Sequence, residues 1–250
     1  MKNKSEYIKF ILPLLIIFFW FIFTYTEKVP PTSLPSLSAV KDTFIEMLKS
    51  GQLSNDLSLS LRRVLAGFFI SSVLGISLGI FMGISSKAKE FFQLTLTAIR
   101  QIPMIAWIPL IILWAGIGEV SKIVVILFAA TFPIVVNTMG GVDSTSETYL
   151  EVAKMYGLSK KDTFFKVYLP SALPNIFTGL RLGLGASWMA VVASELIASS
   201  SGIGYRLNDA RSLMRSDVVI VCMIIIGLVG LLMDKLIVLI SHELTPWKKN

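Results

Sequence analysis

An all-α, polytopic membrane protein with six transmembrane helices is the fold class that three features of this sequence predict. Of its 250 residues, 54% are hydrophobic and only 16% are charged, whereas soluble domains carry about 25% charged residues. The mean hydropathy is +0.73, and the apolar residues gather in six stretches long enough to cross a bilayer. The alternation of about ten residues that marks a membrane β-barrel is absent.

The first apolar stretch, residues 10–25, follows a lysine-bearing N-terminus. No small-residue cleavage site follows it, so we expect a retained first span and not a removed signal peptide. The other five expected spans have helical length and cover about residues 64–84, 94–115, 120–139, 173–197 and 218–240.

Residues 27–60 separate the first two spans and are mostly polar, with three prolines that stop a helix. Apolar residues recur at helical spacing from Val40 to Leu48, behind Ser38 as the expected N-cap. We expect a short amphipathic helix here that lies at the membrane surface.

The lysines and arginines favour a cytoplasmic N-terminus. With six spans, thirteen of the 23 basic residues, Arg100 among them, fall on the inner side, nine fall on the outer side, and Arg181 is left inside a span. Basic residues are enriched in cytoplasmic loops. Both termini and the long loop from about residue 140 to 169 should therefore be cytoplasmic, and the net charge of +7 indicates membrane topology, not a nucleic-acid partner.

Several classes of site have no counterpart in the sequence. Cys222 is the only cysteine, His242 is the only histidine, and no G-x-x-x-x-G-K-[ST] phosphate-binding loop occurs. We therefore expect no metal, no cofactor and no catalytic residue. An ion-coupled secondary transporter is the competing class, but it would show matching discontinuous segments in two halves of the chain, and an intramembrane enzyme would need a reactive pair within the spans.

Small residues mark two expected spans. Gly75, Gly79 and Gly83 recur at four-residue intervals, and Gly179 and Gly183 do the same. Such spacing lets two helix backbones approach closely in a lipid environment. We interpret both sets as helix-packing faces.

The loop at residues 143–170 carries the most specific local pattern. Ser144 or Ser146 can cap a helix that runs to Tyr156, and Gly157 supplies the left-handed residue that ends it. From these residues alone, the loop is either a docking elbow for a soluble partner or a solvated connector.

A second short helix follows in the same loop. Ser159 and Asp162 have the spacing of a capping box, and Pro170 is expected to halt this helix. A small residue at Ala153 lets another surface come close.

The same loop reads Glu151-x-Ala153-x-x-x-Gly157, then nine residues, then Val167-x-Leu169-Pro170. This resembles the EAA loop of bacterial binding-protein-dependent ABC transporter permeases, whose pattern is Glu-Ala-Ala, three residues, Gly, nine residues, Ile-x-Leu-Pro. Val152 and Val167 are the departures, and both are mild apolar changes.

Further segments resemble the permeases of the sulfonate, taurine and nitrate uptake group. They are Ser60-Leu-Arg62-Arg63-Val-Leu-Ala-Gly67-Phe, Ile102-Pro103-Met-Ile-Ala106-Trp107-Ile-Pro109-Leu, Leu113-Trp114-Ala-Gly116-Ile-Gly118, Ser194-Glu195-Leu-Ile-Ala-Ser-Ser-Ser-Gly202-Ile-Gly204-Tyr205 and Asn208-Asp209-Ala. The resemblance implies import of a small anionic solute. Permeases for bicarbonate, aromatic sulfonates and a thiamine pyrimidine precursor belong to the same group and remain alternatives.

The resemblance also implies an architecture and partners. Residues 1–250 would form one permease domain of the type I ABC importer fold, with residues 143–170 as its cytoplasmic coupling loop. The chain would work as a homodimer in the bacterial cytoplasmic membrane, with separate ATPase subunits and an extracytoplasmic substrate-binding protein. The implied ATPase-coupling residues are Glu151, Ala153, Gly157, Leu158, Leu169 and Pro170. Glu151 would either pair with a basic residue of the ATPase or hold the fold of the elbow.

The translocation pathway has to be inferred from polar and aromatic residues within the spans. Arg181, Trp188 and Glu195 follow one another at seven-residue intervals and share one helix face. One hypothesis lets this stripe face a central pathway, where Arg181 binds an oxyanion and Trp188 acts as a gate. In the alternative, Arg181 snorkels to the inner surface and Glu195 caps the outer end of the helix.

Three further pathway candidates lie outside this stripe: Gln101, Trp107 and Asn137. Pro103 and Pro109 lie in the same expected span as Gln101 and Trp107. They either free backbone carbonyls towards a cavity or serve as plain packing kinks.

Overall fold

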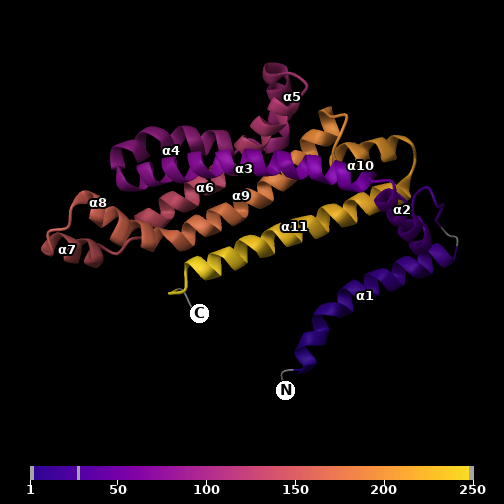
Figure 1. Ribbon diagram of the computed structural model, residues 1–250, viewed down its shortest axis with the longest axis horizontal. Helices are drawn as coiled ribbons and strands as arrows, with labels where there is room; N and C mark the ends of the chain where they lie inside the picture. Colours follow the sequence, from indigo (N-terminus) through magenta and orange to yellow (C-terminus); the bar gives the residue numbers. More distant parts are fainter. Residues whose placement is uncertain (1–2, 27–28, 248–250) are drawn as a thin grey trace.

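The computed structural model describes residues 3–26 and 29–247, and within these ranges the chain is all-helical, as predicted (Figure 1). The helices are α1 (Asn3–Tyr25), α2 (Leu37–Lys49), α3 (Gln52–Ile84), α4 (Ser86–Arg100), α5 (Met104–Ala115), α6 (Glu119–Asp143), α7 (Glu147–Met155), α8 (Lys160–Thr163), the π-helical turn η1 (Phe164–Tyr168), α9 (Leu169–Ala198), α10 (Ile203–Ser212) and α11 (Ser216–Leu244). No strand occurs in the described ranges.

Five continuous helical stretches are long and apolar enough to cross a membrane, and there are six if a bent pair of helices is counted as one span. The five contain α1, α3, α6, α9 and α11, whereas α4 and α5 pass the same test only together, with a bend of 98° between them. The third span was expected as one helix at residues 94–115, but it is broken at Pro103. Proline has no N–H to continue the helix, and it disfavours helical geometry at Ile102 before it.

Glycines bring α3 and α6 into close parallel contact. A Cβ built on Gly67, Gly75, Gly79 or Gly83 of α3 would lie 2.6–2.7 Å from side-chain atoms of Ile126, Ile134, Thr138 or Val142 of α6, respectively. The partners advance along α6 in the same direction and by the same steps as the glycines along α3. The interpretation of these glycines as a packing face is therefore confirmed.

The parallel pair has a consequence for topology. Since α3 and α6 run in the same direction, the chain between them must return to the end of the bundle at which α3 began. The bent pair α4–α5 is that return, which supports counting it as one of six crossings. Figure 1 shows α4 running back along α3, with α5 turning away from it.

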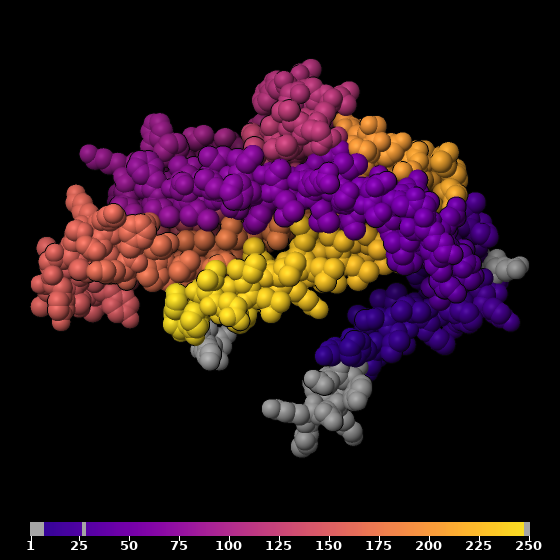
Figure 2. All heavy atoms as spheres, viewed as in Figure 1, coloured from indigo at the N-terminus to yellow at the C-terminus, as the bar shows by residue number. Residues whose placement is uncertain are grey.

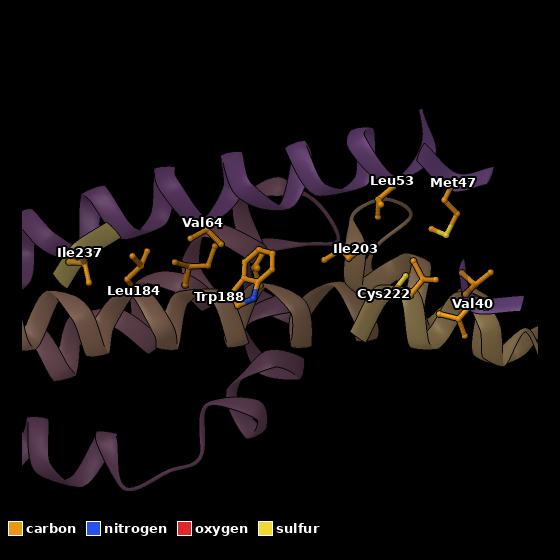
Figure 3. Packing of buried hydrophobic residues seen from close by; sticks show 14 residues of the cluster. Val40, Met47, Leu53, Val64, Leu184, Trp188, Ile203, Cys222 and Ile237 are labelled. Atoms are coloured by element: carbon orange, nitrogen blue, oxygen red, sulfur yellow. The ribbon is translucent and has the colours of Figure 1, made fainter. Parts of the chain in front are cut away.

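Helix α9 packs antiparallel to α6 and is itself lined by α11. Gly179 approaches Asn137 and Ile134, whereas Gly183 lies against Ile134 and Ala130, so the packing role predicted for these glycines is confirmed too. Figure 3 shows the core that joins the layers, with Trp188 of α9 among aliphatic side chains from α3, α9 and α11.

The amphipathic helix predicted after the proline-rich segment is present as α2, but Ser38 is not its N-cap. The helix begins at Leu37 and is capped by Ser36, whose Oγ accepts a hydrogen bond from the backbone N–H of Ala39 at 3.2 Å. A cap side chain must reach a backbone N–H two or three residues on, and Ser38 already lies within the first turn. The apolar face of α2 packs on α11.

Helix α1 stands largely apart from the body of the molecule (Figures 1 and 2). None of the residues in its apolar stretch is buried. Its Trp20 Nε1 donates to the backbone oxygen of Pro35 at 2.9 Å, which fixes the end of α1 to the segment before α2. The remaining apolar surface of α1 suits contact with lipid.

Candidate functional site

The elbow, residues 143–170, forms one end of the molecule (Figure 1). Its first helix, α7, ends in a Schellman motif, with Leu158 N–H donating to the oxygen of Ala153 and Gly157 N–H to that of Lys154, each at 3.0 Å. Gly157 has φ +65°, so the predicted left-handed helix end is confirmed. Ser146 precedes the helix, although its side chain makes no capping bond.

The second half of the elbow differs from the prediction. Ser159 Oγ accepts from the backbone N–H of Asp162 at 3.1 Å, as a capping residue should. Pro170, however, does not halt the helix. The π-helical turn η1 links α8 to α9 through a bond from Leu169 N–H to the oxygen of Phe164. Pro170 falls at the second position of α9, where the missing N–H costs little.

An apolar groove of about 870 Å³ lies between the elbow and the bundle. Among the predicted coupling residues, Ala153, Leu158 and Pro170 line it, and Trp247 of the C-terminal segment forms part of another wall. Ala153 is 3% exposed, so the surface that approaches this small side chain belongs to the same chain. The side of the elbow that faces the bundle is therefore concave and apolar.

The elbow exposes charged side chains beside large apolar and aromatic ones, of which Met155 and Tyr156 are the most exposed. Glu151 is exposed and enters no ion pair in the part of the chain that the structure describes. Lys154, Lys160 and Lys161 are exposed as well, whereas Lys166 lies 3.3 Å from an Asp162 oxygen. Within the described residues, the elbow therefore presents lysines around two exposed carboxylates without an ion pair, Glu147 and Glu151.

The stripe on α9 turns towards other elements of its own chain. Arg181 makes a bidentate ion pair with Asp234 of α11, with Nε–Oδ1 at 2.5 Å and Nη2–Oδ2 at 2.7 Å. Trp188 is 4% exposed, and its Nε1 donates to the backbone oxygen of Ile226 at 3.0 Å. The pathway roles of these residues stay predictions.

Glu195 is enclosed in a polar network that sequence reasoning missed. Its carboxylate accepts from Arg63 Nη1 at 2.6 Å, from Ser60 Oγ at 2.8 Å and from the backbone N–H of Gly204 at 3.0 Å. Arg63 also donates to Glu119 from Nε and Nη2, at 2.7 and 2.6 Å. The network ties α3, α6, α9 and α10 together. Apart from Glu119, its members lie in the segments 60–68 and 194–205 quoted in the sequence analysis, but no local pattern indicated that these segments meet.

The break between α4 and α5 opens a second cavity, of about 400 Å³. Two of the weaker pathway candidates, Trp107 and Asn137, line it together, whereas Gln101 is exposed at the break beside it. Arg100, counted with the inner basic residues in the sequence analysis, also lines this cavity. Trp107 packs against Phe128 with ring centroids 5.4 Å apart.

Comparison with known proteins agrees with these features. The family model described as binding-protein-dependent transport system inner membrane component matches residues 71–245. A putative ABC transporter permease protein of Methanocaldococcus jannaschii is 38% identical, covering 99% of this chain and 94% of that protein. The match therefore spans nearly the whole chain.

Two relatives have more specific names. A putative aliphatic sulfonates transport permease protein of Bacillus subtilis is 37% identical over 96% of this chain and 87% of its own length. The nitrate import permease protein of Synechocystis is 38% identical over 75% of this chain and 68% of its own length. Both names describe permease proteins of transport systems.

The fold is also shared with a solved transporter. A crystal structure of an amino acid ABC transporter with histidines superposes with a TM-score of 0.66 at 16% identity, covering 80% of this chain and 98% of that one. Family members are multi-pass membrane subunits that work with separate ATPase and substrate-binding proteins. The chain belongs to the binding-protein-dependent ABC transporter permeases and is the membrane subunit of an ATP-driven importer.

Proposed function

We propose that this permease imports a small anionic solute of the sulfonate, taurine or nitrate kind. The similarity to permeases named for sulfonates and nitrate, which extends over most of the chain, is the observation that carries the proposal. Bicarbonate, aromatic sulfonates, a thiamine precursor and ion-coupled transport are not favoured by these names.

The elbow is proposed to couple the ATPase to the bundle, with residues 1–250 as a single permease domain. The exposed Glu151 and the lysines around it form a charged surface for a soluble partner, and we assign Glu151 to contact with that partner. Because α8, η1 and α9 form one continuous helical path, a displacement of the elbow would move α9 directly. ATP binding and hydrolysis would thus change access to the pathway without any chemistry in this chain.

We further propose that two copies of this chain form the pathway in the bacterial cytoplasmic membrane, with N- and C-termini in the cytoplasm. Helix α5 supports a second copy, since Leu113, Trp114 and Ile117 are 79%, 66% and 81% exposed at its end. In a membrane protein such side chains contact either lipid or another subunit, and we assign this group to the second copy.

Of the α9 stripe, only Arg181 retains surface for a solute, with 51% of its side chain exposed. Our proposal is that Arg181 exchanges Asp234 for an oxyanion during transport. The burial of Trp188 and Glu195 favours a role in fixing α9 over contact with the solute.

The substrate class can be tested by uptake into proteoliposomes that contain the permease with its ATPase, with ATP inside and the binding protein outside. Labelled methanesulfonate, taurine and nitrate would be compared with a neutral sugar and a cationic amino acid. We expect uptake of at least one of the three sulfonate or nitrate probes and of neither control solute. Transport of only the sugar or the cation would contradict the proposal.

A further inference from the structure

Arg100 is the last residue of α4, and its exposed side chain lines the cavity at the break between α4 and α5. Lys89, near the start of the same helix, pairs with Asp143 at the end of α6, which marks one end of the bundle. Arg100 lies eleven residues beyond Lys89, a rise of about 16 Å. This is roughly half of a hydrocarbon core of about 30 Å.

The guanidinium of Arg100 forms no ion pair with the residues that the structure describes. The ion pairs within residues 3–26 and 29–247 do not include it, whereas Arg63 and Arg181, which also lie in spans, are each held by carboxylates. An arginine at membrane depth is costly unless it faces a counter-charge or a water-filled space. The positive charge of Arg100 is therefore balanced by no carboxylate of the described residues, unlike that of Arg63 or Arg181.

The cavity at the α4–α5 break provides that space. Besides Arg100 it is lined by Trp107, Asn137 and the middle of α6, including Phe128 and Phe132. One amide hydrogen bond of Asn137 is spent within α6, from Nδ2 to the oxygen of Pro133 at 2.8 Å. Its remaining N–H and its carbonyl oxygen stay available for a ligand.

We propose that this cavity binds a monovalent oxyanion in transit, with Arg100 as the group that recognises it. A guanidinium can donate two parallel hydrogen bonds to two oxygens of a sulfonate or nitrate group. The aromatic walls suit the small apolar part of an alkanesulfonate, and about 400 Å³ is within the usual size range of small-molecule sites. The inference rests on the proposed function and adds a site to it.

Binding can be measured on the permease alone through Trp107. The full chain is purified in a non-ionic detergent that carries no phosphate, and lipid is removed, so a lipid headgroup cannot supply the anion. Iodide serves as an anionic quencher of tryptophan fluorescence and acrylamide as a neutral one. Subtracting the signal of Trp107→Phe from that of the wild type isolates the contribution of Trp107.

We expect saturable quenching of Trp107 by iodide, whose half-saturation rises by about tenfold or more in Arg100→Gln. Arg100→Lys should keep saturable binding because it keeps the charge. Arg211→Gln is the matched control: Arg211 is exposed on α10, far along the chain from the cavity, and quenching should stay as in the wild type. Acrylamide should quench all of these variants alike, which shows that the cavity is intact.

Unsaturable iodide quenching, or equal half-saturation in wild type and Arg100→Gln, would overturn the site. The uptake assay then distinguishes failure of the anion site from failure of the proposed substrate class. If Arg100-dependent binding is found and uptake of methanesulfonate, taurine or nitrate falls at least about tenfold in Arg100→Gln, site and transit role both stand. Binding with unchanged uptake would overturn the transit role. Binding without wild-type uptake of any probe would keep the anion site and reject the proposed substrate class.

Discussion

Arg63 and Glu195 have opposite charges inside the bundle, and each is nearly inaccessible, with 3% and 0% of its side chain exposed. A buried charge is tolerated when its partner and further hydrogen bonds satisfy it. Ser60 and the backbone N–H of Gly204 supply those bonds to Glu195. Removing one member of the pair should therefore be far more harmful than removing an exposed ion pair.

Glu195→Ala leaves Arg63 with half of its carboxylate partners and should lower the free energy of unfolding by about 3–5 kcal/mol. Thermal unfolding in detergent would show this as a clear fall in the unfolding temperature. Lys89→Ala, which breaks a pair that is 34% exposed on both sides, is the control and should cost about 1 kcal/mol or less. Equal losses in the two variants would contradict the structural role of the network.

The ion pair of Arg181 with Asp234 offers a second test. If Arg181 contacts the solute, Arg181→Gln should lower uptake of the transported anion, and adding Asp234→Asn should not restore it. We expect this result in the proteoliposome assay, with a loss of about tenfold for one charge-assisted contact. Recovery in the double variant would assign Arg181 a purely structural role.

The contact between α3 and α6 depends on glycines. A Cβ at Gly79 would lie 2.6 Å from Thr138 Cβ and 2.8 Å from the backbone oxygen of Val135. Gly79→Ala should therefore force the two helices apart and cost about 1–3 kcal/mol. Gly227→Ala is the control, since nothing lies within 4 Å of its Cβ position; the unfolding temperature should fall only in the first variant. Similar behaviour of both variants would refute the close packing.

The elbow depends on the backbone of Gly157. A β-branched residue strains a left-handed backbone, so Gly157→Val should cost about 1–2 kcal/mol locally and distort the turn between α7 and α8. We expect normal insertion of the chain but weaker co-purification of the ATPase. Gly140→Ala, in α6 with open space around its Cβ position, should leave co-purification unchanged. Full recovery of the ATPase with Gly157→Val would contradict the role of this turn.

Local features were predictable from the sequence, and long-range pairs were not. Gly157 could be assigned because a helix end needs a left-handed residue within a few positions, and the four-residue glycine spacing indicated a packing face. The pairs Arg181–Asp234 and Arg63–Glu195 join residues 53 and 132 positions apart, and no periodicity within one helix reveals such partners. The prediction that Pro170 halts the helix was wrong because the preceding π-helical turn, which accommodates the proline, has no simple sequence pattern.

At the scale of the whole molecule, the proposed ATPase contact and the proposed anion site lie in different regions. The elbow, which we propose as the surface for a soluble partner, lies at one end of the molecule, and α5 projects from the bundle away from it (Figure 2). The cavity at the α4–α5 break is lined by residues of α4, α5 and α6 and by none of the elbow. The continuous path from α8 to α9 connects the two regions. In the coupling that we propose, the energy enters through the ATPase at the elbow, and the membrane potential and ion gradients drive no step.

Anion uptake into proteoliposomes under two energy sources tests most directly whether ATP drives transport through this permease. Vesicles with the permease and ATPase, and binding protein outside, would contain either ATP or ADP, each with and without ionophores that collapse proton and sodium gradients. We predict uptake of a sulfonate or nitrate probe only with ATP inside, unchanged by the ionophores. Uptake that proceeds with ADP and disappears when the gradients are collapsed would contradict the account.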